Sequence, residues 1–143
     1  PTYEHQAAEK LSPEAGDLLA ASESARDEVG RIPLRLWAEV TDVVELRDPG
    51  VLPRLTGQHI YTPQTLDERF HYRRPGLFVL PVRIYQRAEP FLMPDSPHFA
   101  GCRSWVDLPD DVSTAGAQAV LSDEEFAARW QDLKTALTPS AMA

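Results

Sequence analysis

The residues best suited to binding chemistry lie between Arg69 and Arg87, in the stretch RFHYRRPGLFVLPVRIYQR. This stretch has five arginines and no acid, so it carries a local charge of +5 in a chain whose net charge is −8. Phe70, His71 and Tyr72 are interleaved with the first arginines. A guanidinium group forks phosphate oxygens, and both guanidinium groups and aromatic rings stack on bases. The composition is therefore typical of a site for an anionic, planar ligand.

Two interpretations of these arginines stay open. In the first, they pair with neighbouring carboxylates as ordinary surface ion pairs, which contribute little to stability. In the second, Arg69, Arg73 and Arg74 bind the phosphates of a nucleic acid or nucleotide. The two interpretations differ in whether the guanidinium groups are already neutralised within the protein.

A second set of residues has the types needed for acid–base catalysis. Glu4 and His5 are adjacent in PTYEHQ, and His59 lies in QHIYTP. These three could act as acid and base in a hydrolase of modified nucleosides or nucleic acid. A lone histidine is more often a structural group, and the GxSxG, HExxH and phosphate-cradling glycine motifs are absent. We therefore favour a protein that is not an enzyme, and we expect no metal and no cofactor.

Length, charge and cysteine content limit the class of protein. A chain of 143 residues that is 43% hydrophobic suits one domain over residues 1–143, with a frayed tail at 139–143. The acidic net charge disfavours non-specific binding along duplex nucleic acid. The single cysteine, Cys102, excludes an internal disulfide and is compatible with a reducing compartment. No apolar run approaches the roughly 20 residues that span a bilayer, so we expect a cytoplasmic protein without a membrane partner.

Two apolar stretches should form the framework that positions these residues. Residues 77–85 are apolar, β-branched and aromatic, which predicts a strand that is buried along most of its length and central in its sheet. Pro81 cannot donate a ladder hydrogen bond, so an unpaired side or a bulge is expected there. Residues 34–46 alternate in polarity, which predicts a strand paired with the first. A short strand is predicted over 101–108, and the prolines of 88–97 predict an extended segment.

Capping signals mark the helices. Surface helices are predicted over 12–26 and 63–70, each with a hydroxyl residue followed by proline at its start, and at most a short helix over 51–55. In the last helix, LSDEEF supplies Ser122 as the N-cap and Glu125 as its capping-box partner. The apolar stripe that should pack this helix on the sheet consists of Phe126, Trp130, Leu133 and Leu137.

Several segments stand out by their order along the chain: WAEVTDVVELRDP, HIYT, the stretch 70–85, GCRSWVDL and LSDEEFAARW. With them the chain resembles, over nearly its whole length, a bacterial family catalogued as domain of unknown function 1802. In that family PTYEHQ follows a further N-terminal segment that ends in an apolar strand. The resemblance therefore implies that part of the fold precedes Pro1. The family is associated with restriction-type genes, which implies a restriction-modification or defence setting and a protein partner from such a system.

The middle of the chain is also similar to EVE and ASCH domains, which are PUA-like barrels. The similarity rests on the order of a strand, a DP turn, a loop with HIYT, and RRPGLFVLPVRIYQRAEPFLMP. It implies a base held in an aromatic pocket with arginines on the flanking backbone. The side chains that could line such a pocket here are Trp37, His59, Tyr61, Tyr72 and Trp105.

These observations predict an α+β fold, a small and mostly antiparallel PUA-like sheet or barrel with the C-terminal amphipathic helix packed on it. The function expected is that of a nucleic-acid or modified-base reader in restriction or defence. Two alternatives stay open. One is the hydrolase based on Glu4, His5 and His59, and the other is an acidic subunit that binds a basic protein partner.

Overall fold

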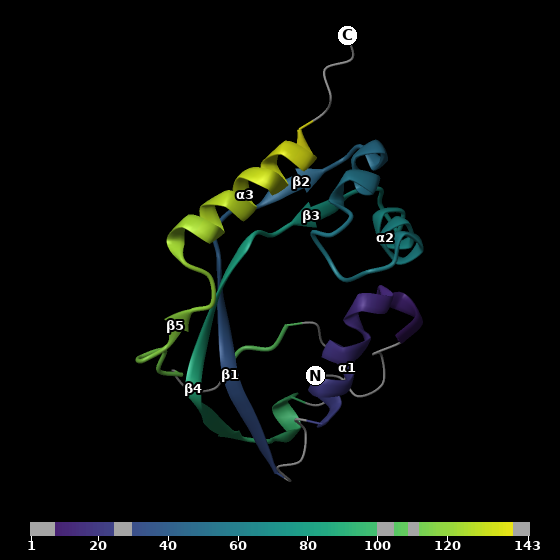
Figure 1. The fold of residues 1–143 in the computed structure, drawn as a ribbon. Coiled ribbons are helices and arrows are strands. Elements are labelled where there is room, and N and C mark those ends of the chain that lie inside the picture. The colour runs from purple at the N-terminus through teal and green to yellow at the C-terminus, as the bar shows by residue number, and fades with distance from the viewer. Residues whose placement is uncertain (1–7, 25–29, 100–104, 109–111, 139–143) are drawn as a thin grey trace.

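The computed structural model describes residues 8–24, 30–99, 105–108 and 112–138. Its strands form two antiparallel sheets (Figure 1). The first sheet has the order β1-β4-β5, with β1 at Arg31–Val40, β4 at Val82–Pro94 and β5 at Gln118–Ala119. The second pairs β2 (Val44–Leu46) with β3 (Leu77–Val79). The α+β class with antiparallel pairing is confirmed, and the described strands close no barrel.

The helical elements are a mixture of α-helices and short 3-10 helices. The α-helices are α1 (Gly16–Ser24), α2 (Pro63–Phe70) and α3 (Asp123–Leu137). The 3-10 helices are η1 (Ala8–Lys10), η2 (Pro13–Ala15), η3 (Pro49–Leu55) and η4 (Pro97–Phe99). No helix in the described part of the chain is long and apolar enough to cross a membrane.

The predicted pairing of the two main apolar stretches is confirmed. β1 pairs with β4 and β2 pairs with β3, so residues 31–46 run antiparallel to residues 77–94. We call the β1–β4 part the ribbon. Its register places Trp37 and Glu39 opposite Tyr85 and Arg83, while Val40 lies opposite Val82. Side chains alternate between the two faces of a strand. The ribbon therefore has one polar-aromatic face and one apolar face.

Pro81 interrupts this pairing, as its missing N–H predicts. Its carbonyl oxygen accepts hydrogen bonds from the backbone N–H and the hydroxyl of Thr41, at 3.0 and 3.1 Å. The prediction of one continuous strand over 77–85 is wrong, because the chain changes from the second sheet to the first at this point. The predicted burial is also wrong, since Phe78, Leu80 and Val82 are exposed. The central position is confirmed for β4 alone, which lies between β1 and β5.

The hydrophobic core lies at one end of the molecule, where η3, α2 and α3 meet β2 and β3 (Figure 1). We call this region the core end. Its buried side chains are Leu46, Val51, Leu52, Leu55 and Phe70. The last helix covers η3 through half-buried Leu133, Ala136 and Leu137. The predicted packing of α3 on the sheet is therefore corrected to packing mainly on η3, with none of its described side chains fully buried.

Other local predictions are confirmed only in part. The helix expected over 12–26 begins as η2 and continues as α1 to Ser24, and Ser12 makes no side-chain capping bond. The extended segment is the second half of β4, followed by η4. Residues 105–108 contain no strand, and 101–104, with Cys102, lie outside the described residues. The tail at 139–143 lies outside them as well.

Candidate anion-binding site

Helix α2 provides the frame of the candidate site. It begins as predicted, with Pro63 at its first turn and the Thr62 hydroxyl accepting the Thr65 backbone N–H at 3.2 Å. Thr65 is buried, and its hydroxyl lies 2.9 Å from that of Thr62. At the other end Phe70 is 1% exposed and anchors the helix in the core. Arg69 directly precedes this anchor and is exposed.

A tight turn follows the C-terminus of α2 and brings Arg73 and Arg74 close to Arg69 in the chain. The backbone N–H of Tyr72 donates to the Arg69 carbonyl at 3.3 Å, and that of Arg74 donates to the Tyr72 carbonyl at 2.8 Å. Between them Arg73 has φ 63, the only positive φ of a non-glycine residue in the described chain. The carbonyl end of a helix attracts positive charge. The end of α2 and the turn after it therefore hold three exposed arginines, Arg69, Arg73 and Arg74, where the helix dipole favours positive charge.

A distant segment completes the site. Leu11 forms an isolated antiparallel bridge with Tyr61, and Ser12 N–H donates to the Ile60 carbonyl at 2.7 Å. The Thr62 N–H donates to the Lys10 carbonyl at 3.0 Å. Because Thr62 also caps α2, these bonds fix the backbone of Lys10 relative to that helix.

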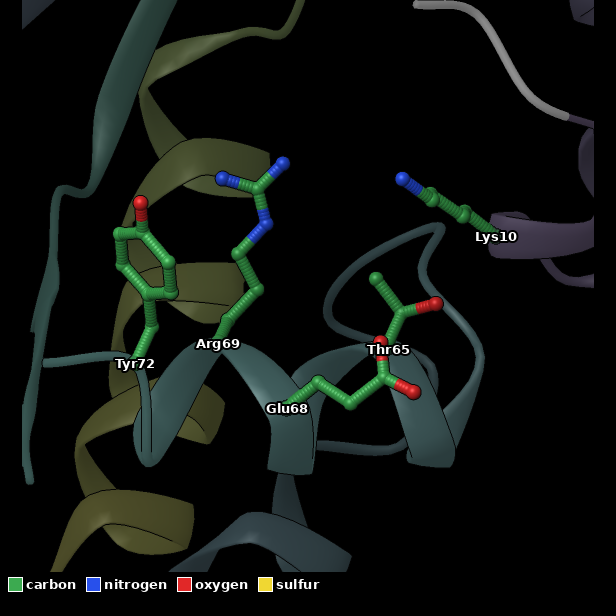
Figure 2. Close-up of a pocket in the computed structure, with 5 residues that line it drawn as sticks. All are labelled: Lys10, Thr65, Glu68, Arg69 and Tyr72. Atoms are coloured by element: carbon green, nitrogen blue, oxygen red, sulfur yellow. The ribbon is translucent and has the colours of Figure 1, made fainter.

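The two segments enclose a pocket of about 290 Å³ lined by Lys10, Thr65, Glu68, Arg69 and Tyr72. Figure 2 shows the Lys10 ammonium and the Arg69 guanidinium extending toward the same open space from opposite sides. The Tyr72 hydroxyl lies beside the guanidinium. Two cationic side chains and one hydroxyl group thus line the cavity, with Lys10 facing Arg69 and Tyr72.

The pocket contains one acid, Glu68, which is directed elsewhere. Its carboxylate accepts a hydrogen bond from the side-chain amide of Gln64 at 2.9 Å. Figure 2 shows the carboxylate on the Thr65 side of the pocket, away from the Arg69 guanidinium. Within the described parts of the chain, neither Lys10 nor Arg69 forms a salt bridge.

The five arginines of the basic stretch fall into two groups. Arg83 is largely covered: it bonds Asp123 at 2.5 Å and lies over the Phe126 ring at 5.0 Å. Arg87 donates to the Ser113 carbonyl at 2.7 Å. By contrast, Arg73 and Arg74, like Arg69, have no acidic partner among the described residues. The ion-pair interpretation therefore holds for Arg83, and the group at the end of α2 is available to a ligand.

The aromatic side chains predicted to bind nucleic acid are distributed over several places. Tyr72 lines the pocket, and the Arg73 guanidinium lies 5.0 Å from its ring centroid. His59 and Tyr61 contact each other in the preceding loop, with ring centroids 6.3 Å apart. Trp37 stacks on Tyr85 of the ribbon at 4.1 Å, and Trp105 is 82% exposed. Neither tryptophan lines the pocket.

The residues of the catalytic alternative are only partly placed. Glu4 and His5 lie outside the described residues. His59 Nδ1 accepts the Tyr61 N–H at 3.2 Å, and its buried Nε2 has no hydrogen-bond partner within the described chain. The described residues contain no group of three or more His, Cys, Asp or Glu side chains able to hold a metal ion.

Sequence reasoning missed Lys10, Thr65 and Glu68. Thr65 and Glu68 lie four residues and one residue before Arg69 on α2, so helical spacing could have suggested them. Lys10 gave no local signal, because only the pairing of residues 10–12 with 60–62 brings it to α2. Chemically, the assembled site can bind an oxyanion through two cations and a hydroxyl, next to an arginine–tyrosine stack that can receive a base.

Comparison with known proteins gives one match. The model of the family described as "Domain of unknown function (DUF1802)" matches residues 1–132. No curated protein and no solved structure matches the chain.

Proposed function

The chain belongs to the DUF1802 family, and from the site at the end of α2 we propose that it is a non-enzymatic binder of single-stranded nucleic acid or nucleotides. The observation that carries this proposal is the shared pocket of Lys10 and Arg69, whose charges no described acid neutralises. Unpaired cations that converge on one cavity favour an oxyanion, and a guanidinium can bond it through two parallel N–H groups.

The neighbouring residues favour nucleic acid over a simple anion. Tyr72 and Arg73 form an exposed stack beside the pocket, and both groups can hold a base by its face. The chain carries a net charge of −8, so the positive region is local. Duplex binding generally requires a broad basic surface, whereas a single strand can bring one phosphate and one base to a small site.

Two finer parts of the proposal rest on resemblance. The order of β1, the loop with HIYT and then β4, with β1 and β4 paired in one antiparallel ribbon, supports a relation to PUA-like domains, in which a modified base would be the ligand that is read. The resemblance to a family associated with restriction-type genes supports a role in restriction or defence, with a protein partner from that system.

Binding measurements with fluorescent single-stranded, duplex and base-modified oligonucleotides test the proposal. We expect the single strand to bind, and Arg69→Gln to weaken its binding and to lower the log–log salt slope by about 0.7, the value for one lost phosphate contact. The double variant Arg73→Gln with Arg74→Gln should lower both quantities further. Arg31→Gln is the matched control, because it removes one exposed charge from the far end of β1.

A parental protein that binds none of these oligonucleotides would refute the nucleic-acid proposal. Equal losses in Arg69→Gln and Arg31→Gln would show that only net charge matters, and the pocket would lose its assigned role. Thermal melting of each variant separates loss of binding from loss of folding.

The hydrolase alternative has one observation in its favour, the buried Nε2 of His59 without a partner in the described chain. Tyr72→Ala and His59→Ala distinguish the two functions. For a reader that stacks Tyr72 on a base, the tyrosine variant should lose roughly 1–3 kcal/mol of binding free energy per base, while the histidine variant binds as the parent does. Product formation from a nucleoside or oligonucleotide that disappears in His59→Ala would replace the reader with an enzyme.

A further inference from the structure

The charge of the pocket identifies the part of a nucleic acid that fits it. Lys10 and Arg69 approach one cavity from two separate segments, η1 and α2 respectively. An internal phosphodiester carries a single negative charge, whereas a terminal phosphomonoester carries about −1.5 to −2 near neutral pH. Two cations directed at the same space match the terminal group better than the internal one.

On the basis of the proposed function, we propose that this pocket binds the terminal phosphate of a single nucleic-acid strand. Lys10 and Arg69 would bind its oxygens, and the Tyr72 hydroxyl would donate to it from the Arg69 side. The first base of the strand would stack on the pair formed by Tyr72 and Arg73.

The size of the pocket suits a single phosphate group. Thr65 and Glu68 belong to the same helix as Arg69, and Lys10 lies on the opposite side of the opening (Figure 2). A cavity of about 290 Å³ has room for a phosphate group and part of its sugar. It is smaller than typical sites for drug-sized ligands.

Glu68 gives the pocket a means to select one phosphate. Its carboxylate lies on the Thr65 side and is bonded to Gln64, so it leaves the cations available to the ligand. A second phosphate placed on that side would meet a like charge, which costs free energy in a partly enclosed site. The acid should therefore confine the bound anion to the space between Lys10 and Arg69.

The test compares one short oligothymidylate in three forms, with a 5′-phosphate, with a 3′-phosphate and with two hydroxyl ends. One phosphorylated form should bind about tenfold or more tightly than the hydroxyl form, as expected for new charge-assisted hydrogen bonds. Thymidine monophosphate and inorganic phosphate identify the source of the anion. If either binds as tightly as the phosphorylated strand, the ligand is a free phosphate compound and the strand-end proposal is overturned.

Variants locate the effect. Lys10→Gln and Arg69→Gln should each remove most of the gain from phosphorylation while the hydroxyl strand keeps residual binding through Arg73 and Arg74. Glu68→Gln should raise affinity for the phosphorylated end more than Asp67→Asn does. Asp67 is the matched control, because it is the neighbouring acid on α2, lies outside the pocket lining and contacts His71 at 3.4 Å.

The outcomes separate this inference from the proposed function. If all three strands bind equally and the binding still depends on Arg69, the protein is a nucleic-acid binder that does not recognise ends, and this inference fails alone. If neither the strands nor thymidine monophosphate bind, both fail. If a phosphopeptide binds through Lys10 and Arg69 more tightly than the phosphorylated strand, the nucleic-acid source is overturned.

Discussion

The core end and the ribbon are built from similar residues but use them differently. At the core end, the apolar side chains of η3, α2, β2 and β3 surround Phe70. On the ribbon, Leu36, Val40 and Val82 are exposed, although their sequence is as apolar as that of a buried strand. The difference arises because the buried side chains of η3 and α2 pack against Leu46, Leu77 and Val79 of β2 and β3. Apolar composition is thus a requirement for burial, and a second layer decides where burial occurs.

This difference explains why the candidate site is attached to the core end. Arg69 immediately precedes the most buried large side chain of the described chain, Phe70, and the turn that holds Tyr72 is closed by the Gly76 N–H bonded to the Phe70 carbonyl at 2.9 Å. Ligand-binding side chains are positioned most accurately when packed elements support them. The ribbon offers aromatic side chains such as Trp37, which stacks on Tyr85 and does not line the pocket at the end of α2.

The largest expected effect comes from removing the side chain at the centre of the core. Phe70→Ala should lower the free energy of unfolding by about 3–5 kcal/mol, because it leaves a cavity among packed neighbours. Phe78→Ala is the matched control, since Phe78 is 66% exposed on β3 and should cost less than about 1 kcal/mol. Urea denaturation measures both. Equal losses in the two variants would abolish the distinction between a packed end and an exposed strand face.

The elements predicted correctly are those whose signals are local. Thr62 before Pro63 and Ser122 before Glu125 are capping sequences, and both helices begin where those sequences place them. Alternation over 34–46 correctly predicted that this segment pairs with the apolar stretch 77–85, although the structure divides it into β1 and β2 with a break between Val40 and Val44. Pro81 correctly indicated an irregularity, because a missing N–H has the same effect in any sheet.

The features missed depend on contacts between distant segments. Whether Phe78 is buried depends on a covering layer that β3 does not encode. The sequence predicted at most a short helix over 51–55 and did not identify Val51, Leu52 and Leu55 of η3 as core residues, although their spacing of three and four residues suits one helical face. Of the candidate site, Arg69, Tyr72, Arg73 and Arg74 could be predicted as a sequence cluster. Lys10 could not, since a bridge over fifty residues brings it there.

A moderate effect is expected at the start of α3, which connects the two regions. Ser122→Ala should cost about 1 kcal/mol of unfolding free energy, because the Glu125 backbone N–H loses its bond to the Ser122 hydroxyl. Ser122→Asp, which can still cap, is the control and should retain most of the parental stability. If alanine and aspartate behave alike, the cap contributes nothing and α3 is held by its contacts with η3 alone.

A smaller effect should depend on pH. The backbone N–H and the hydroxyl of Ser122 donate to the Glu125 carboxylate, which lowers the pKa of that carboxyl from its ordinary value of 4.5. A lowered pKa means that the stabilisation is complete above the ordinary pKa and is lost as the pH falls through the folded-state value. Glu125→Gln should therefore be less stable than the parent at neutral pH, and the two unfolding midpoints should converge in acid. A difference that grows below pH 4.5 would contradict the assigned sign.

The smallest effect on stability, together with a clear effect on binding, is expected at Arg73. Its φ of 63 is unfavourable for a residue with a side chain, by roughly 1–2 kcal/mol. Glycine adopts this conformation freely, but it loses more backbone entropy on folding, by roughly 0.5–1 kcal/mol. These terms oppose each other, so Arg73→Gly should change the unfolding free energy by less than about 1 kcal/mol in either direction. It should nevertheless weaken oligonucleotide binding, because it removes a cation and uncovers the Tyr72 ring. Arg73→Asn tolerates positive φ and serves as a second variant without the charge. Parental binding in both variants would show that the strained turn serves only to connect α2 with β3, and that Arg69 and Lys10 act without it.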